Sequence, residues 1–148
     1  MKDKLFIGFK GKNNLSCLLV KKLDRESFLL TNSFSGLKND IDCIDTAYDC
    51  VILFGTDKKL AGNVRIERTA EKDGVRYLSA FDPEKIAASF RQAGLAAEIA
   101  DTPTAWLCNE AYWHLLRKTG GRAVLIHIPT MKNADELFTA KVRQALGL

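Results

Sequence analysis

The sequence predicts an α/β fold, specifically a three-layer α/β/α sandwich built on a mostly parallel sheet. Segments with strand character alternate with amphipathic segments along most of the 148 residues, and this alternation is typical of a sheet with helices on both faces. Residues 49–55, DCVILFG, form a continuous apolar run closed by glycine, as in a strand buried on both faces. No repeat or linker interrupts the chain, so we expect a single domain over residues 1–148.

The first third of the chain carries two expected strands and one clear helix before this central strand. Residues 4–9, KLFIGF, are predicted to form a short buried strand that ends in a Gly/Lys/Asn loop. Residues 15–23 place apolar side chains at helical spacing, with one of the two preceding asparagines as the cap. Residues 27–31 are the second strand candidate, and the polar segment 32–48 leaves room for one or two helical turns.

The middle of the chain predicts a hairpin followed by a well-delimited helix. Residues 63–70 alternate between apolar and polar and indicate one strand, and the KDG sequence at residues 72–74 is a turn signal. Residues 75–80 are therefore expected to pair back as a hairpin. The helix that follows is bounded by Asp82 as N-cap, a proline at the first helical position, and Gly94 as the stop.

The last third predicts a strand, a helix, a strand and a final helix. Residues 96–100, AAEIA, form a short strand candidate, and an amphipathic helix follows that ends at a Thr-Gly-Gly sequence. Residues 122–129, RAVLIHIP, indicate another buried strand. The final helix is expected over residues 133–147, with Asn133 as its cap.

Composition narrows the class of protein. Apolar residues make up 47% and charged residues 27% of the chain, an ordinary globular balance. No apolar run approaches the ~18 residues of a membrane-spanning helix, and the first residues lack a signal peptide's apolar stretch. We therefore expect a cytoplasmic protein that does not bind membranes. The net charge is +4 and the lysines are scattered, so we expect no nucleic-acid partner.

The cysteines and histidines indicate neither a metal site nor a disulfide framework. The four cysteines form no CxxC pair, and the two histidines stand at no metal-ligand spacing. We expect no metal and no other cofactor. Because the chain has ample apolar material for a core, reduced thiols are the simpler interpretation.

Two of these residues are candidates for chemistry. Cys108 follows the strand at residues 96–100 through a loop and begins a helix, and His127 lies near the end of the strand at residues 122–129. Functional groups of parallel α/β folds gather at the carboxyl ends of the strands, so both residues could face one edge. A helix N-terminus and a neighbouring imidazole lower a thiol pKa and activate it as a nucleophile. From the pattern alone, core packing explains either residue as well.

Three short motifs add a family resemblance. Residues 104–109 read TAWLCN, residues 127–129 read HIP, and residues 64–70 read VRIERTA. They resemble, respectively, the GT[YF][VL]CN, HVP and I..ERVA motifs of the type I pyroglutamyl peptidases, also called pyrrolidone-carboxylate peptidases. That family consists of cytosolic cysteine peptidases that remove an N-terminal pyroglutamate. Its members carry a Cys–His–Glu triad on an α/β sandwich.

The resemblance implies a role for each matching residue. Cys108 would be the nucleophile, His127 the base, and Glu67 the residue that orients the histidine. Phe9, in a FIGF sequence similar to the family's opening VTGFEPFGG, would bind substrate. The substrate would be a small peptide or N-acyl amide, and assembly into a homo-oligomer stays open. Without the resemblance, Glu67 is more simply an exposed strand residue paired with a neighbouring arginine.

The sequence also departs from the family pattern around the expected pocket. Phe9 is followed only by Gly, Lys and Asn where the family has a second aromatic residue, and residues 55–63, GTDKKLAGN, replace the glycine-rich GLAGGR. Thr104 and Ala105 stand where the family has Gly-Thr. The chain is also shorter than usual before Tyr48. A catalytically inactive relative that keeps the fold as a binding module is therefore the alternative hypothesis.

Overall fold

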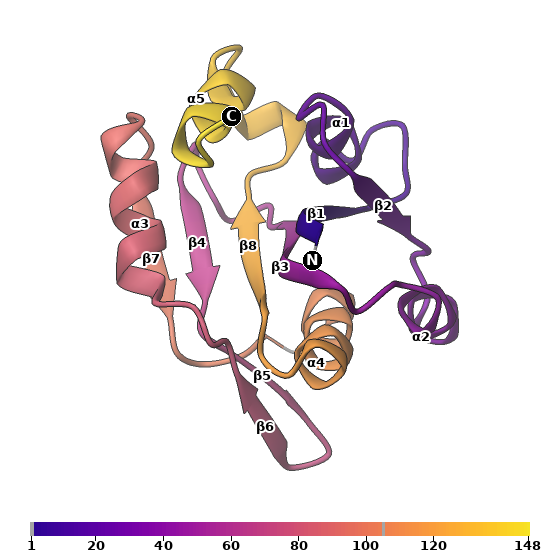
Figure 1. Cartoon of the computed structure of the whole chain (residues 1–148). Coiled ribbons are helices and arrows are strands. Elements are labelled where there is room, and N and C mark those ends of the chain that lie inside the picture. The colour runs from indigo at the N-terminus through magenta and orange to yellow at the C-terminus, as the bar shows by residue number, and fades with distance from the viewer. Residues whose placement is uncertain (1, 105) are drawn as a thin grey trace.

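A computed structural model describes residues 2–104 and 106–148 and contains a six-stranded central sheet with a separate two-stranded hairpin (Figure 1). The strands are β1 (Lys2–Phe9), β2 (Ser27–Leu30), β3 (Tyr48–Thr56), β4 (Val64–Glu67), β5 (Thr69–Lys72), β6 (Val75–Leu78), β7 (Ala97–Ala100) and β8 (Ala123–Ile128). The helices are α1 (Leu15–Lys21), α2 (Phe34–Asp42), α3 (Pro83–Gln92), α4 (Leu107–Thr119) and α5 (Phe138–Ala145), with a 3-10 turn at Met131–Asn133.

The central sheet is mostly parallel, with two strands reversed at one side. Its order is β2-β1-β3-β8-β4-β7. The four strands from β2 to β8 run parallel to one another. β4 pairs antiparallel with β8 and parallel with β7, so β4 and β7 run opposite to the rest. The carboxyl ends of β1, β3 and β8 consequently share one edge of the sheet, where β4 begins.

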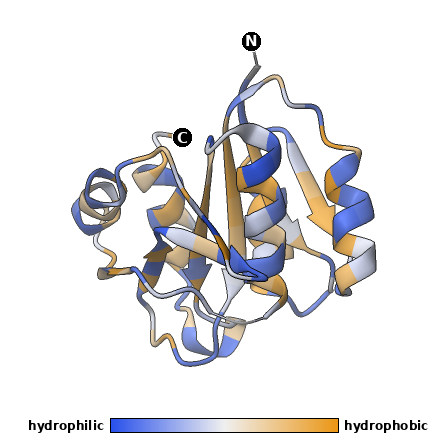
Figure 2. Cartoon of the chain, turned by 90° about the horizontal axis from the view of Figure 1, so that it is seen from below, coloured by the Kyte–Doolittle hydropathy of each residue, from blue (hydrophilic) through white to orange (hydrophobic). Residues whose placement is uncertain are grey.

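Helices cover both faces of this sheet, which confirms the three-layer α/β/α sandwich expected from the sequence. On one face α2 and α4 pack against side chains such as Leu53 and Leu125. On the other face α1, α3 and α5 pack against side chains such as Phe54 and Ile126. Figure 2 shows the central strands as largely hydrophobic, whereas the helices carry hydrophilic segments as well. Burial of these two apolar layers is the main stabilising contribution to the fold.

Close packing of α1 on β1 depends on a glycine. A Cβ atom built on Gly8 would lie 2.5 Å from the carbonyl oxygen of Ser16. The Ser16 hydroxyl, which is fully buried, accepts a hydrogen bond from the Phe9 N–H at 3.0 Å and donates to the N-cap residue Asn14 at 2.6 Å. The contact therefore fixes the start of α1 against the carboxyl end of β1.

Two segments differ from the sequence-based expectation. Residues 63–70 form two strands rather than one, because the chain changes partner at Arg68. The N–H of Arg68 donates to Ala100 of β7, and its carbonyl accepts from Ser79 beside the hairpin. The last helix begins at Phe138 instead of capping at Asn133. Asn133 instead ends the 3-10 turn, and its side-chain amide donates to the Lys58 carbonyl of the loop after β3.

The remaining elements agree with expectation to within a few residues. Asn14 caps α1, Asp82 caps α3, and Gly120 ends α4 in the left-handed conformation with φ 64°. α2 spans nine residues, slightly more than the one or two turns expected. Within the described residues, no helix is long and apolar enough to cross a membrane.

Candidate active site

Cys108 is the second residue of α4, at the helix end that faces the loop after β3. The helix begins at an unusual N-cap, Trp106, which supplies no side-chain cap hydrogen bond, although polar residues are strongly preferred there. Its buried face, including Ala111 and Leu115, packs on the sheet. Unpaired N–H groups at the start of a helix carry partial positive charge, so this end of α4 can stabilise a negative charge beside the thiol.

Gly55 of β3 lies next to both the Cys108 thiol and the His127 imidazole. Gly55 is directly paired with His127 of β8. A Cβ atom built on Gly55 would lie 2.5 Å from Cys108 Sγ and 3.4 Å from His127 Cδ2. The thiol and the Cδ2 edge of the imidazole therefore lie next to the same point above Gly55. The contacts within the described residues include no Sγ–imidazole hydrogen bond, as is common for catalytic pairs without substrate.

Glu67 contacts the other side of the imidazole. Its Oε1 atom lies 2.8 Å from His127 Nδ1, and both side chains are almost completely buried. A carboxylate accepts a hydrogen bond from an imidazole N–H, and we assign the proton to Nδ1 on this ground, which leaves Nε2 as an acceptor. The second carboxylate oxygen of Glu67, Oε2, has no partner among the described residues. The exposed-strand interpretation of Glu67 is therefore wrong, although its pairing with a neighbouring arginine is present.

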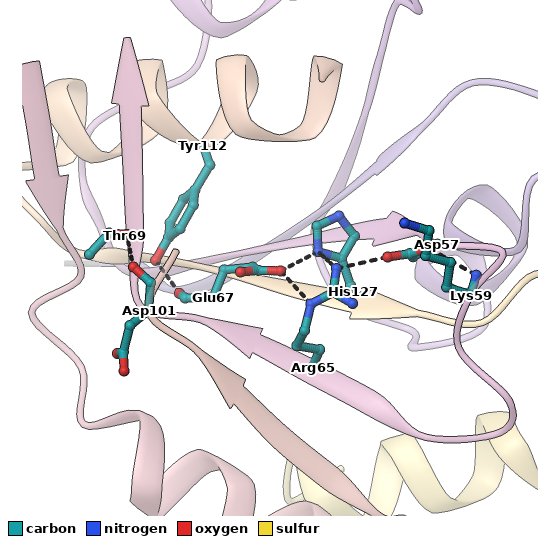
Figure 3. A network of polar contacts seen from close by, with 8 residues as sticks. All are labelled: Asp57, Lys59, Arg65, Glu67, Thr69, Asp101, Tyr112 and His127. Atoms are coloured by element: carbon teal, nitrogen blue, oxygen red, sulfur yellow. Dashed lines mark hydrogen bonds and ion pairs between the residues drawn. The ribbon is translucent and has the colours of Figure 1, made fainter. Parts of the chain in front are cut away.

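That arginine, Arg65, is a site residue that sequence reasoning did not propose. Its Nε donates to Glu67 Oε1 at 2.7 Å, and one terminal nitrogen donates to Asp57 Oδ2 at 2.8 Å. The same nitrogen lies 3.3 Å from His127 Nδ1, and Figure 3 shows the four side chains in one network. Arg65 stands opposite His127 because β4 and β8 are antiparallel. The alternation of Arg65 and Glu67 was visible in the sequence, but this pairing was not.

The surroundings of Cys108 do not produce the lowered thiol pKa that the helix start suggested. Burial raises the pKa of the Cys108 thiol to about 12, and the carboxylates of Asp57 and Glu67 add to this, while Arg65 opposes it. Burial also tends to raise the pKa of Asp57, but hydrogen bonds from the Lys59 N–H and from Arg65 lower it overall. The resting thiol is therefore protonated at neutral pH.

Two further side chains of α4 fix the nucleophile relative to the glutamate. The Asn109 amide accepts from the Glu71 N–H at 3.1 Å and donates to the Glu71 carbonyl at 2.8 Å, so it completes the edge of β5. The buried Tyr112 hydroxyl donates to the Glu67 carbonyl at 2.8 Å. Helix α4 therefore carries Cys108 and also contacts Glu67, the last residue of β4, through Tyr112.

A surface pocket opens at this edge and contains Cys108 and His127. The other side chains that line it are Thr56, Asp57, Lys58, Lys59, Thr104 and Trp106. Phe9, the residue expected to bind substrate, does not line this pocket: its side chain is 3% exposed and belongs to the core on the α4 face. Trp106, by contrast, is 77% exposed at the pocket.

The strand that precedes Cys108, β7, runs in the opposite direction to the one expected. The prediction placed the carboxyl end of β7 at the same edge as the end of β8. That step was wrong, because β7 runs antiparallel to β8 and Ala100 pairs with Glu67, which lies opposite Leu125. The connection from β7 to α4 instead leads back toward the carboxyl end of β8. Ala105, part of the altered turn before Cys108, lies outside the described residues.

The described residues contain no group of three or more His, Cys, Asp and Glu side chains arranged to hold a metal ion. Cys17, Cys43, Cys50 and Cys108 are all free thiols. The arrangement of thiol, imidazole and carboxylate matches the nucleophile, base and orienting group of a thiol hydrolase.

Comparison with solved structures shows that the chain has a known fold. No family sequence model and no curated protein sequence matches the chain. Among solved structures, pyrrolidone carboxyl peptidase from Thermococcus litoralis superposes with a TM-score of 0.79 at 20% identity, over 99% of this chain and 92% of that one. Pyroglutamyl peptidase I from Bacillus amyloliquefaciens gives a TM-score of 0.81 at 20% identity, over 99% and 91% of the two chains. The Thermus thermophilus enzyme gives 0.77 at 17% identity, over 97% and 98%.

These superpositions cover nearly the whole of each chain. The protein therefore has the fold of the pyrrolidone carboxyl peptidases, which confirms the fold that the three sequence motifs implied.

Proposed function

We propose that the protein is a cysteine hydrolase of the pyroglutamyl-peptidase type, which removes pyroglutamate or a related small acyl group from the N-terminus of peptides. The observation that carries this proposal is the meeting of Cys108 and His127 at Gly55, with Glu67 2.8 Å from the far imidazole nitrogen. The likeness of fold to pyrrolidone carboxyl peptidases supports it. The proposed setting is the cytoplasm, where the free thiols stay reduced.

The chemistry follows from the protonation states at the site. His127 Nε2 accepts the thiol proton as Cys108 Sγ attacks the acyl carbonyl carbon, and the carbonyl π electrons move to oxygen. The N–H groups at the start of α4 stabilise that oxyanion. Collapse of the intermediate breaks the C–N bond, and the imidazolium gives its proton to the leaving amine. Water, deprotonated by His127, then hydrolyses the thioester and regenerates the thiol.

The raised pKa of Cys108 determines which form of this mechanism is proposed. Because burial and two carboxylates disfavour the thiolate, the proton leaves sulfur during the attack instead of beforehand. Glu67 stabilises the imidazolium that forms, and Arg65 holds the Glu67 carboxylate in place at 2.7 Å. Arg65 is thus a positioning residue in this proposal.

A second candidate function is a catalytically inactive relative that binds acyl peptides without cleaving them. Two observations favour it: the raised pKa of the Cys108 thiol, and the burial of Phe9 in the core, outside the pocket lining. The two candidates share the pocket and differ only in whether a thioester forms.

Hydrolysis of a fluorogenic pyroglutamyl amide under reducing conditions separates the candidates. The hydrolase proposal expects turnover by the wild type and none by Cys108→Ala or His127→Ala. Equal rates for the wild type and Cys108→Ala would contradict it. Binding of the amide without turnover by the wild type would support the inactive relative.

A further inference from the structure

The side chains that line the pocket beside Cys108 differ from those expected of a site for a small neutral ring. Trp106 presents a large planar apolar surface that is 77% exposed. Its position as N-cap is locally unfavourable, since it caps no N–H group. Trp106 therefore offers a planar apolar surface on which a ligand beside Cys108 can stack.

The charges around the pocket are unevenly neutralised. The carboxylates of Asp57 and Glu67 both pair with Arg65, at 2.8 and 2.7 Å. Lys58 and Lys59 also line the pocket, and within the described chain neither ammonium group forms an ion pair or a hydrogen bond. Asp57, Glu67 and Arg65 together keep one negative charge beside Cys108, whereas the exposed Lys58 and Lys59 add two positive charges at the rim of the pocket, so the net charge there is positive.

We propose that Trp106, Lys58 and Lys59 determine specificity, and that the preferred ligand is a carboxylate-bearing amide with a planar apolar group. The planar group stacks on the Trp106 ring, and the carboxylate is attracted to the two ammonium groups. This inference deepens the proposed function and rests on it for the identity of the scissile amide. Binding at the pocket does not require turnover, so the two can be tested separately.

The binding test uses benzoate, benzamide and acetate as probes. Benzoate has the planar ring and the charge, benzamide has the ring alone, and acetate has the charge alone. We expect benzoate to protect Cys108 from alkylation, measured by peptide mapping, at concentrations roughly five- to tenfold below those needed for benzamide or acetate. Added salt should remove most of the advantage of benzoate over benzamide. Equal protection by benzoate and benzamide would overturn the role of the lysines.

Matched variants assign the effect to residues. Lys58→Met with Lys59→Met should abolish the preference for benzoate over benzamide. The consecutive lysines Lys21 and Lys22 are exposed, lie at the end of α1 and do not line the pocket. The double change Lys21→Met with Lys22→Met alters the net charge equally and should preserve the preference. Loss of the preference in this control would show a general charge effect and contradict the proposal.

The aromatic part of the proposal has its own readout. Trp106→Ala should weaken protection by benzoate about tenfold and leave protection by acetate unchanged. Titration with benzoate should change the tryptophan fluorescence of the wild type. In Trp106→Ala the buried Trp113 is the remaining tryptophan, so the fluorescence should not respond to benzoate. Unchanged benzoate protection in Trp106→Ala overturns stacking. If the wild type hydrolyses pyroglutamyl amides but shows no preference among the three probes, the specificity proposal fails while the hydrolase proposal stands.

Discussion

At the scale of single residues, the candidate site depends on a position with no side chain. Gly55 leaves room for the Cys108 thiol, which lies 2.5 Å from where a Cβ atom would be. Gly55→Ala should therefore displace Sγ and lower the hydrolysis rate by about 100-fold, because small misplacements of reacting groups are costly. The sulfur is the end of a side chain and can rotate, so the free energy of unfolding should change by only about 1 kcal/mol. Steady-state kinetics and denaturant unfolding measure both quantities, and an unchanged rate would contradict this account of Gly55.

The charged neighbours of Cys108 predict opposite effects of two substitutions on its reactivity. Asp57 raises the thiol pKa, whereas Arg65 lowers it. Asp57→Asn should therefore increase the rate of Cys108 alkylation at a fixed pH below the thiol pKa, by roughly three- to tenfold, and Arg65→Gln should decrease it. In the wild type the rate should keep rising as the pH increases above 9, since a thiol with a pKa of about 12 is still mostly protonated there. The exposed Cys43 is an internal control, and a plateau of the Cys108 rate near neutral pH would show a preformed thiolate.

At the scale of elements, the packing of α1 on β1 offers a contrast to Gly55. A Cβ atom on Gly8 would also meet an atom at 2.5 Å, but that atom is the backbone carbonyl oxygen of Ser16, which cannot rotate away. Gly8→Ala should therefore lower the free energy of unfolding by about 3 kcal/mol or more, while the folded fraction keeps its activity. Thermal unfolding with activity per folded molecule measures this. A Gly8→Ala protein that is as stable as wild type but inactive would reverse the expected contrast.

The link between α4 and the β5–β6 hairpin predicts a coupled effect on stability and rate. Asn109→Asp keeps the size of the side chain but removes the donor to the Glu71 carbonyl, which should cost about 1–3 kcal/mol. Because Asn109 is adjacent to Cys108, kcat should fall with little change in KM. Thr119→Val removes a hydrogen bond to Leu115 at the far end of the same helix and serves as the control. If both substitutions lower kcat equally, Asn109 has no special role in placing the nucleophile.

The sequence predicted most elements and the proximity of Cys108, His127 and Glu67, and the errors arise from contacts between residues distant in the sequence. Apolar periodicity and capping residues are local, so α3 and its cap Asp82 were predictable from neighbouring residues alone. Strand direction is not local: nothing near residues 63–70 or 96–100 indicates that β4 and β7 run opposite to β8. Arg65 enters the site only through that antiparallel pairing. The burial of Phe9 likewise depends on how α2 and α4 cover the end of β1.

At the scale of the whole molecule, the two apolar layers share the central strands. Side chains alternate along β3 and β8 between the α2/α4 face and the α1/α3/α5 face, so neither layer can open without disturbing the other. Unfolding should be a single cooperative transition. Far-ultraviolet circular dichroism and the fluorescence of the buried Trp113, measured in Trp106→Phe, should have coincident midpoints, whereas separated midpoints would show that the layers unfold independently.

The central claim, that Cys108 is the nucleophile of a hydrolase, is tested most directly by trapping its thioester. An activated pyroglutamyl ester is mixed briefly with the protein, and the intact mass and the modified peptide are then measured. The account predicts one acyl group per chain on Cys108 in the wild type, and its loss in both Cys108→Ala and His127→Ala. Acylation spread over the other three cysteines, or an undiminished rate of acylation in His127→Ala, would contradict the claim.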